Sequence, residues 1–582
     1  INCWCFQPIK QQQLIKNMKK KIIDIIIIFI LALIVSIPLA SKDLDIYVDD
    51  GIQHIARLMG TYQTIAEGEF PPVIMSNFCN QFGYSWNIFY SPLTAYVPMI
   101  FRIFTNSYEL ILKLFILLLS FLTGIAMYVF VNKVTKNRYA GILAAALYMF
   151  APYRLTDTYM RVAISELASF VFLPITFLGM YNIFNSEEKS TKKSLALTLG
   201  AVGLILTHIV MAMYAAIFCF IYMLVNVKKL KDKQIWKMLG INILLIILLT
   251  SFYLLPMLEH KFATNYEVFQ TGRMERTSEL IRNKVDPIDL LYTIEGNLSF
   301  EIGLVVLSGL VFTQLTYKKI NREARKIYWV SLIAGFVCII MSLRFFPFEK
   351  MPAVLKMIQF TFRLLEFSSF FFAFVAATNY SLVIKNFNMK DVFVLSLLTI
   401  LLVVPLKKNL DYDRLWSEDK LWPAVMVTDN TGRVHAGCAT FEYLPSKAFE
   451  NLDYIKHREN RVYILNGNAS IENEVKRGTN MTFDVTTQEN VELELPYIYY
   501  LGYTVEITNE NGETAELETF ESDNGFVAIN LEEGMNGNIQ VKYTGTALMK
   551  VSYVISIGAV IVLIGVWVFR KVKNNKEKVQ HG

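Results

Sequence analysis

The chain has 582 residues, of which 54% are hydrophobic and only 18% are charged. Soluble domains are nearer one quarter charged, so this composition excludes an ordinary soluble protein. Long charge-free stretches recur along the chain and indicate a polytopic membrane protein. The net charge of +6 does not indicate nucleic-acid binding, because the lysines and arginines fall in short loops between apolar runs.

The N-terminal region contains a first apolar run that follows a cluster of lysines. We expect residues 1–17 to be disordered or not translated, because Met18 and the three lysines after it make a better start. The first membrane span is predicted over residues 22–40. Its end resembles that of a secretory signal, but the apolar run is longer than a signal peptide requires. We therefore predict an uncleaved span, and a cleaved signal is the alternative left open.

The remaining apolar runs predict about 12 membrane spans in total. The predicted spans cover residues 22–40, 109–131, 139–152, 162–184, 238–256, 301–316, 327–343, 358–380, 391–406 and 549–569, with two short crossings inside 195–226. One long crossing over 195–226 is the alternative, but it would place a lysine cluster outside, whereas a hairpin keeps both flanking clusters inside and puts His208 at its outer turn. The apolar piece 93–104 is predicted to lie in the outer interface, since a crossing there would force the basic loop 133–138 outside.

Residues 409–546 differ from the rest of the chain. They are polar, they alternate between apolar and polar residues, and turn signals such as Asn466-Gly467 and Asn511-Gly512 separate the alternating stretches. This pattern predicts a β-sandwich-like domain of extracytoplasmic location before the last span. The predicted organisation is a multispan membrane domain (18–408) with outer loops 41–107 and 257–299, the β-rich domain (409–546), a transmembrane helix (547–570) and a basic cytoplasmic tail (571–582).

The six cysteines include no C-x-x-C pair, so no redox or zinc motif is predicted from them. In the predicted topology Cys79 and Cys438 both face outside, which leaves open whether they form a disulfide bond.

A cluster of titratable residues follows the first span directly. It contains Asp49, Asp50, His54 and Arg57. If Asp50 starts a helix, then Asp50, His54 and Arg57 lie on one face of it.

Other polar residues reach the same predicted outer boundary of the membrane. They are Arg154, Asp157, Arg161, Glu166, His208, Glu259, His260, Gln359, Arg363 and Glu366. A charge costs about 2.5–3.5 kcal/mol at the bilayer centre but less near its edge, so the coincidence across several spans is the evidence for a site. Each position has a structural alternative: Arg161 with Glu166 as an interface pair, Arg363 with Glu366 as a local salt bridge, and His208 as a turn residue.

A site of this composition supports a specific kind of chemistry. A carboxylate can deprotonate an acceptor hydroxyl during displacement at a sugar carbon, and arginines can hold a lipid-phosphate leaving group. Asp49, Asp50 and His54 are also suitable ligands for Mg²⁺ or Mn²⁺. The chain contains no Walker A, Rossmann or G-x-S-x-G pattern, so we expect no nucleotide cofactor.

Several stretches resemble one group of bacterial membrane proteins. They are Asp50-Gly-Ile-Gln-His54-Ile-Ala-Arg57, Phe89-Tyr90-Ser-Pro92-Leu93, Tyr153-Arg154 through Arg161 and Glu166, Leu206-Thr-His208, Ile358-Gln-Phe-Thr-Phe-Arg363-Leu-Leu, and Leu495-Pro496-Tyr-Ile-Tyr-Tyr500. The group is the YfhO-like type, which includes the proteins described as "membrane protein, 6-pyruvoyl-tetrahydropterin synthase-related". The likeness covers most of residues 20–570, with Thr361 and Phe362 replacing the Pro and Trp of that group's Gln-Phe-Pro-Trp-Arg-Leu pattern. The sequence contains neither a soluble pterin-binding domain nor a His-triad spacing.

The resemblance implies a helical fold like that of the GT-C glycosyltransferase superfamily, with Asp50 as the base, assisted by Asp49. We count His54, one helical turn after Asp50, as the third catalytic candidate. Arg154, Arg161 and Arg363 are the implied phosphate-site residues, and Arg57, Glu166, His208 and Gln359 are further candidates for substrate binding.

We therefore expect a multi-pass protein of the bacterial cytoplasmic membrane, with both termini inside. It would transfer a sugar from a polyprenyl-phosphate donor to an envelope polymer, with no nucleic-acid partner. The alternatives are a transporter or flippase of lipid-linked saccharides and a non-catalytic assembly protein.

Overall fold

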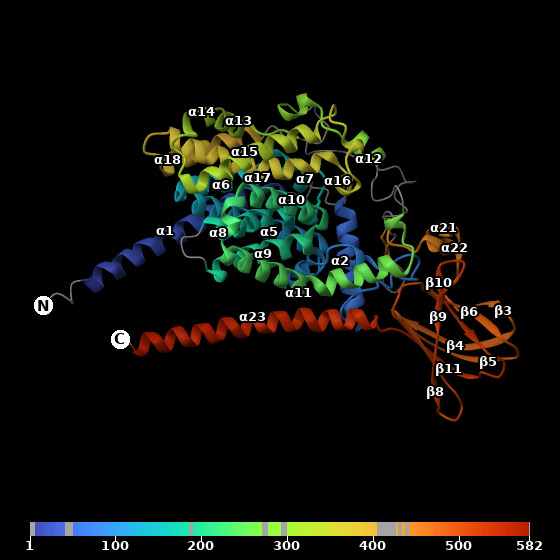
Figure 1. Ribbon diagram of the computed structural model, residues 1–582. Coiled ribbons are helices and arrows are strands. Elements are labelled where there is room, and N and C mark those ends of the chain that lie inside the picture. The colour runs from blue at the N-terminus through green and yellow to red at the C-terminus, as the bar shows by residue number, and fades with distance from the viewer. Residues whose placement is uncertain are drawn as a thin grey trace. The chain divides into compact units, whose positions relative to one another are not determined.

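The computed structural model describes residues 6–40, 50–185, 190–270, 277–292, 300–403, 426–428, 434–436 and 441–580. The chain divides into two compact units (Figure 1). The helical unit comprises residues 1–51, 101–242 and 276–414, and the β-containing unit comprises residues 52–100, 243–275 and 415–582.

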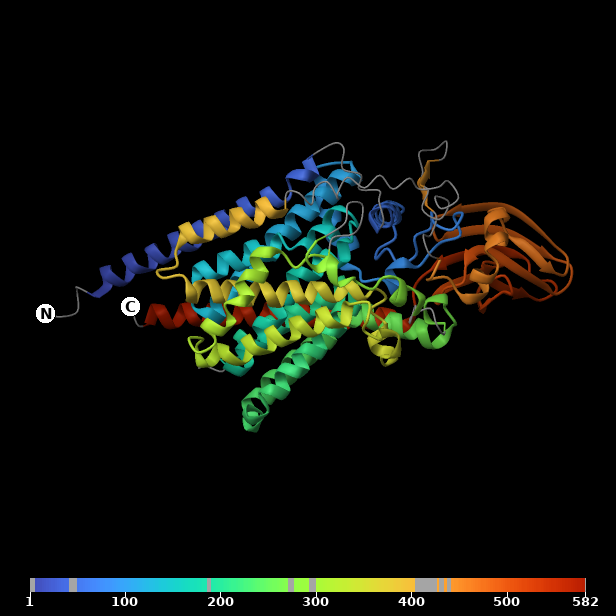
Figure 2. The ribbon, with the colours of Figure 1, turned by 90° about the horizontal axis from the view of Figure 1, so that it is seen from above.

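The helical unit is a bundle whose members run roughly parallel to one another in both views (Figures 1 and 2). Its helices are α1 (Phe6–Val35), α5 (Tyr108–Thr135), α6 (Arg138–Met149), α7 (Pro152–Tyr159), α8 (Ile164–Asn185), α9 (Thr191–Thr207), α10 (Ile209–Val225), α12 (Thr277–Arg282), α13 (Leu304–Val311), α14 (Thr313–Thr316), α15 (Arg322–Ser342), α16 (Ala353–Lys356), α17 (Leu364–Val383) and α18 (Met389–Val403). α2 (Asp50–Ala66) begins in this unit, and so does α11 (Lys233–Ala263). Short 3₁₀ turns join several of them, among them η3 (Val227–Lys231) and η7 (Thr361–Arg363).

Length and apolar composition make six of the described helices long enough to cross a membrane. They are residues 108–135, 164–185, 233–263, 322–342, 361–383 and 547–573. The chain is thus mainly helical, and several of its helices are long and apolar enough to span a membrane, as the composition predicts. The larger number of predicted spans stays a prediction. The helices α6, α9, α10 and α18 are shorter than these six, and α1 is not among the six although it is 30 residues long.

Small residues let α8 and α9 pack closely in the helical unit. A Cβ on Gly179 would lie 2.1 Å from the backbone nitrogen of Leu197, and one on Gly200 would lie 2.4 Å from that of Thr176. Such close approach is typical of helices packed in a membrane. After α9 the chain turns at His208, whose backbone is extended, and α10 begins. The apolar run 195–226 is therefore two helices, whereas the two membrane crossings predicted for it stay a prediction.

Two helix boundaries differ from the expected ones. α1 starts at Phe6, so residues 6–17 are helical although we expected them to be disordered or absent. This stretch is rich in glutamine and lysine, which favour helix. α11 continues through Pro256 to Ala263, beyond the predicted span end, and Pro256 is accommodated inside the helix.

The described part of the β-containing unit holds two larger antiparallel sheets and a small one that pairs β1 with β2 (Figure 1). The four-stranded sheet has the order β3 (Tyr463–Asn466), β6 (Val491–Ile498), β10 (Phe526–Leu531) and β9 (Thr519–Glu521), and the five-stranded sheet has the order β4 (Ala469–Arg477), β5 (Asn480–Thr487), β11 (Gly537–Tyr543), β7 (Tyr503–Thr508) and β8 (Thr514–Leu517). The unit also contains α3 (Trp86–Phe89), α4 (Leu93–Tyr96), η2 (Val97–Ile103) in part, η4 (Glu267–Phe269), β1 (Met426–Thr428), β2 (Val434–Ala436), α21 (Ser446–Glu450), α22 (Leu452–His457) and α23 (Ala547–Gln580).

Both larger sheets contribute to one hydrophobic core, as in a sandwich. β5 alternates buried and half-buried residues, so Met481, Phe483 and Val485 point inward. In the other sheet Leu493 and Ile529 face each other in register and are both buried. The predicted β-region near the C-terminus is thus present.

The loop that precedes the bundle belongs to this core as well. Buried aromatic residues of the stretch 73–89, such as Phe78 and Phe82, pack with the residues of the sheets. The backbone N–H of Ile498 donates to the carbonyl of Phe82 at 2.9 Å, and Nζ of Lys476 donates to that of Gln81 at 2.6 Å. We assigned the outer loop 41–107 to the membrane domain, but its residues 52–100 fold with the β-strands because their aromatic side chains complete the core.

The cysteines of the described chain are in two states. Cys79, in the loop that packs on the sheets, is disulfide-bonded, whereas Cys219 and Cys338 are free thiols. Cys438, the other cysteine expected outside, lies outside the described residues.

Candidate functional site

The centre of the candidate site is Arg161, in the turn between α7 and α8. Its guanidinium is fully buried and faces three carboxylates. Nη1 donates to Oδ1 of Asp157 at 2.6 Å and to Oε2 of Glu166 at 3.0 Å, and Nη2 donates to Oδ2 of Asp50 at 3.2 Å. One arginine therefore joins the start of α2 to α7 and α8.

Glu166 extends this arrangement to α17. Its Oε2 also accepts a hydrogen bond from Nε of Arg363 at 3.1 Å, and its Oε1 accepts one from the hydroxyl of Tyr153. Nη1 of Arg363 donates to the carbonyl of Ile358 and to Oε1 of Gln359, both at 3.0 Å. We call Asp50, Asp157, Arg161, Glu166 and Arg363 the Arg161 cluster.

Local structure determines why these side chains meet. Asp50 is the first residue of α2 and Glu166 lies in the first turn of α8, where the helix dipole favours a negative charge. The N–H of Asp50 donates to the carbonyl of Arg161 at 3.0 Å, so its backbone and its side chain are both held by the same residue. Arg363 ends the 3₁₀ turn η7, which places it directly before α17.

Aromatic rings cover the two arginines. The guanidinium carbon of Arg363 lies 4.9 Å from the centre of the Phe360 ring, and that of Arg161 lies 5.1 Å from the centre of the Phe362 ring. Rings at these distances attract a cation and exclude water. The ion pairs of the cluster are therefore stronger than pairs at a protein surface.

Asp157 is the most isolated carboxylate of the cluster. It is fully buried, and its Oδ2 accepts no hydrogen bond from any described residue. Burial raises the pKa of Asp157 well above its ordinary value, and the negative charge of Glu166 raises it further, although Arg161 opposes both. Folding thus shifts the protonation equilibrium of this carboxyl towards its neutral form.

We expect Asp157→Asn to make the stability of the protein less sensitive to alkaline pH. A carboxyl whose pKa is raised by folding stabilises the folded state below its unfolded pKa of about 4, and this contribution is lost as the pH rises through the folded pKa. Asparagine keeps the oxygen that accepts from Arg161 but does not titrate. The melting temperature of the variant should therefore exceed that of the wild type by a margin that grows between about pH 5 and pH 8. A constant difference across this range would contradict the shifted pKa.

Only part of the Arg161 cluster is open to a ligand. The side chain of Asp50 is 35% exposed, whereas those of Asp157, Arg161 and Glu166 are between 0% and 2% exposed. Nη2 of Arg363 makes no hydrogen bond to any described residue, and the side chain of Arg363 is 10% exposed. The cluster thus presents one carboxylate and one pair of N–H groups.

Two other candidates in the helical unit have different partners. Arg154 is fully buried and donates to the carbonyl of Met149 at 3.1 Å and to the hydroxyl of Ser120 at 2.9 Å, not to the cluster. His208 is the N-cap of α10, where its Nδ1 accepts from the N–H of Met211 at 3.4 Å. Burial lowers the pKa of His208, the positive charge of Arg363 lowers it further, and the negative charge of Glu166 opposes both.

The candidates that follow Asp50 on α2 belong to the β-containing unit. Arg57 is buried and donates to Oδ1 of Asn87 at 2.9 and 3.1 Å and to the carbonyls of Tyr90 and Ser91 at 3.1 and 3.0 Å. These bonds hold its own loop together. His54 is buried and lies edge-on to the ring of Tyr90, with 6.3 Å between ring centres.

The proposed divalent-cation ligands do not form a described site. Asp49 lies outside the described residues, and Asp50 and His54 belong to different units. Within the described ranges, no group of three His, Cys, Asp or Glu side chains lies close enough to hold a metal ion.

Sequence reasoning gave no specific role to three residues that contact the candidates, although it placed Asp157 at the same membrane boundary. Tyr153 donates to Glu166, Asp157 pairs with Arg161, and Ser169 donates to both carboxylate oxygens of Glu366 at 2.7 and 2.8 Å. The i, i+4 spacing of Asp157 and Arg161 was a readable signal for the pair. No sequence signal joins Ser169 to Glu366, because they lie on different helices.

The fold and the cluster define a polytopic helical membrane protein with a buried charge cluster and a separate β-region. A family model described as 6-pyruvoyl-tetrahydropterin synthase related domain, membrane protein, matches residues 88–410, which is more than half of the chain. The chain therefore belongs to this family, and the resemblance noted in the sequence is confirmed. It is also 24% identical to an uncharacterised protein of Lactococcus lactis subsp. cremoris (strain MG1363), in a match that spans 98% of this chain and 99% of that protein.

Proposed function

We propose that the protein is a GT-C-type glycosyltransferase of the bacterial cytoplasmic membrane. It transfers a sugar from a polyprenyl-phosphate donor to a polymer of the cell envelope on the outer face of the membrane. One observation carries the proposal: Arg161 and Glu166 connect an exposed carboxylate, Asp50, to an arginine with unused N–H groups, Arg363. A base and a phosphate ligand in one cluster are what such a transfer requires.

Asp50 is the base in this proposal. It is the most exposed carboxylate of the cluster, and Arg161 fixes its orientation through both the side chain and the backbone of Asp50. A base held in one position by a charged neighbour loses less entropy when it reaches the acceptor hydroxyl. Asp49 is the second candidate for this role.

Arg363 is the residue that we propose for the leaving phosphate. Its Nε and Nη1 are already occupied, which fixes the plane of the guanidinium and directs Nη2 to a ligand. Arg161 positions Asp50, because its hydrogen bonds go to carboxylates of the cluster. Arg154 is a weaker candidate than the sequence suggested, since Ser120 and Met149 occupy its guanidinium.

The proposed reaction is a single displacement. The carboxylate of Asp50 takes the proton of the acceptor hydroxyl, and the acceptor oxygen forms a bond to the anomeric carbon of the sugar. The bond between that carbon and the phosphate oxygen breaks on the opposite side. Polyprenyl phosphate leaves with the electron pair, and Arg363 stabilises its charge.

We also propose the orientation in which both termini and the basic loops are cytoplasmic and the β-containing region is outside. The basic loops 133–138 and 318–326 support it through the positive-inside rule. The disulfide of Cys79 supports it too, because disulfides persist in oxidising compartments.

The test uses the full chain reconstituted in liposomes. Polyprenyl phosphate carrying a labelled hexose is supplied in one sample and the nucleotide-linked hexose in another, each with isolated cell-wall polymer. The proposal predicts transfer of label to the polymer and release of polyprenyl phosphate in the first sample only. Movement of the intact donor across the bilayer would instead indicate a flippase. If no donor is consumed or moved, the result would favour an assembly protein.

A further inference from the structure

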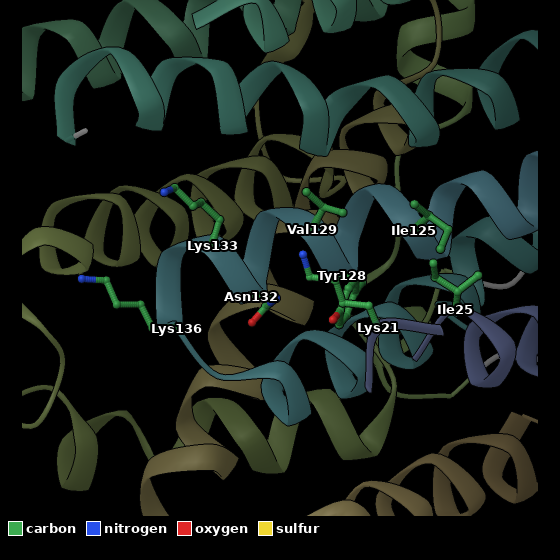
Figure 3. Close-up of a pocket in the computed structure, with 8 residues that line it drawn as sticks. All are labelled: Lys21, Ile25, Ile125, Tyr128, Val129, Asn132, Lys133 and Lys136. Atoms are coloured by element: carbon green, nitrogen blue, oxygen red, sulfur yellow. The ribbon is translucent and has the colours of Figure 1, made fainter. Parts of the chain in front are cut away.

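A cavity of about 490 Å³ lies between α1 and α5, apart from the Arg161 cluster. It is lined by Lys21, Ile25, Ile125, Tyr128, Val129, Asn132, Lys133 and Lys136. Figure 3 shows Lys133 and Lys136 at one end of this cavity and Ile25 and Ile125 at the other, with Asn132 and Val129 between them. The lining is therefore divided into a cationic end and an apolar end.

The three lysines that line the cavity are available to an anion. Neither Lys21 nor Lys133 forms a salt bridge with any described residue, and both are exposed. Lys136 faces Glu323 at 3.6 Å, but both side chains are largely exposed, and such pairs contribute little. Asn132 adds an amide that can donate a hydrogen bond.

A second carboxylate close to the cavity, that of Asp24, is already neutralised by an arginine. Asp24 is buried next to Arg138, whose Nε lies 3.1 Å from each of its carboxylate oxygens. The hydroxyl of Tyr128 donates to Oδ2 of Asp24 at 2.7 Å. Asp24 is thus held away from the lysines, and the cavity keeps a net positive charge.

The apolar end is only partly covered by the helical unit. Ile25 and Val129 expose 44% and 42% of their surface, so no other part of the protein covers them fully. A free phosphate ion would satisfy the lysines but would leave these side chains uncovered. A ligand with an anionic head and a hydrocarbon tail covers both ends.

We propose that this cavity binds an anionic phospholipid of the inner leaflet. The head-group phosphate lies among Lys21, Lys133 and Lys136, and the start of an acyl chain lies along Ile25, Ile125 and Val129. Basic pockets between membrane helices on the cytoplasmic side are suited to such head groups. The inference rests on the proposed orientation of the basic loops but not on the proposed transferase activity, since none of these residues belongs to the Arg161 cluster.

The test compares lipids with identical acyl chains on the purified full chain in detergent. Binding of phosphatidylglycerol and of phosphatidylcholine is measured by native mass spectrometry and by the shift in melting temperature. We expect phosphatidylglycerol to bind at least tenfold more tightly. The double variant Lys133→Gln/Lys136→Gln should lose most of this preference. The matched control is Lys228→Gln/Lys231→Gln, which removes two exposed lysines of η3 outside the cavity. This control should keep the preference for phosphatidylglycerol.

A second variant distinguishes a binding site of defined shape from simple electrostatic attraction to the lysines. Val129→Trp keeps every lysine but fills the apolar end, so it should weaken phosphatidylglycerol binding at least fivefold without changing the melting temperature of the lipid-free protein by more than a few degrees. Equal binding of the two lipids would overturn the proposal. So would an equal loss of binding in the control double variant, or stabilisation by inorganic phosphate that matches the effect of phosphatidylglycerol.

Discussion

Asp50→Asn is expected to lower the rate of sugar transfer by about 10²–10⁴-fold, the usual contribution of a general base. The amide oxygen of asparagine can still accept the hydrogen bond that Nη2 of Arg161 donates. The variant should therefore insert in the membrane and melt within a few degrees of the wild type. The measurement is transfer of label from polyprenyl phosphate by equal amounts of reconstituted protein.

The matched control is Asp289→Asn. Asp289 is a partly exposed acid in the η5 turn (Pro287–Leu290), and it has no bond to the Arg161 cluster. This control should keep the rate of the wild type. Full transfer by Asp50→Asn would remove Asp50 from the role of base, and equal losses in both variants would indicate a general effect of charge.

Glu166→Leu should have the largest effect on stability, a loss of about 3–5 kcal/mol in the free energy of unfolding. Glu166 is fully buried and neutralises two guanidinium groups. Without it Arg363 has no carboxylate partner among the described residues, and the buried hydroxyl of Tyr153 loses its acceptor. A buried charge without a partner is one of the costliest defects in a folded protein. Thermal and denaturant unfolding in detergent measure the effect.

An exposed ion pair provides the comparison for this prediction. Glu109 pairs with Lys113 at 2.6 Å on α5, where Glu109 is 38% exposed. Glu109→Leu should cost no more than about 1 kcal/mol. If Glu166→Leu proved as mild as this control, the Arg161 cluster would not be the main polar support of the helical unit.

The sequence was most informative where one residue pattern decides the structure. The apolar runs predicted as spans over 162–184 and 358–380 coincide with the long apolar helices 164–185 and 361–383, and the break at His208 follows from the lysines on both sides of one over-long run. Alternation and Asn-Gly turns marked the β-region in the same way, because a period of two residues fits a β-strand and does not fit a helix. These features are local, so a single sequence contains them.

The sequence predicted which residues belong to the candidate site but not which of them bond to each other. Asp50, Arg161, Glu166, Gln359 and Arg363 were all expected at one membrane boundary, and hydrogen bonds connect them in the structure. Which side chains bond to which depends on how the helices pack, and the sequence does not contain that information.

The same limit accounts for the expectation that Arg154 and Arg57 bind substrate. Each has the residue type that a phosphate site needs, but packing gives each a set of partners of its own. Ser120 and Met149 accept from Arg154, and Asn87 accepts from Arg57. An arginine is read from the sequence as a charge, whereas its hydrogen-bond partners are set by tertiary structure.

The most direct test of a single displacement with Asp50 as base is the anomeric configuration of the transferred sugar. A polyprenyl-phosphate sugar of known configuration is supplied to the reconstituted protein, and the linkage in the product is determined by NMR. The proposed mechanism predicts inversion at the anomeric carbon. Retention of configuration would contradict it, because retention requires two displacements through a covalent sugar–enzyme intermediate.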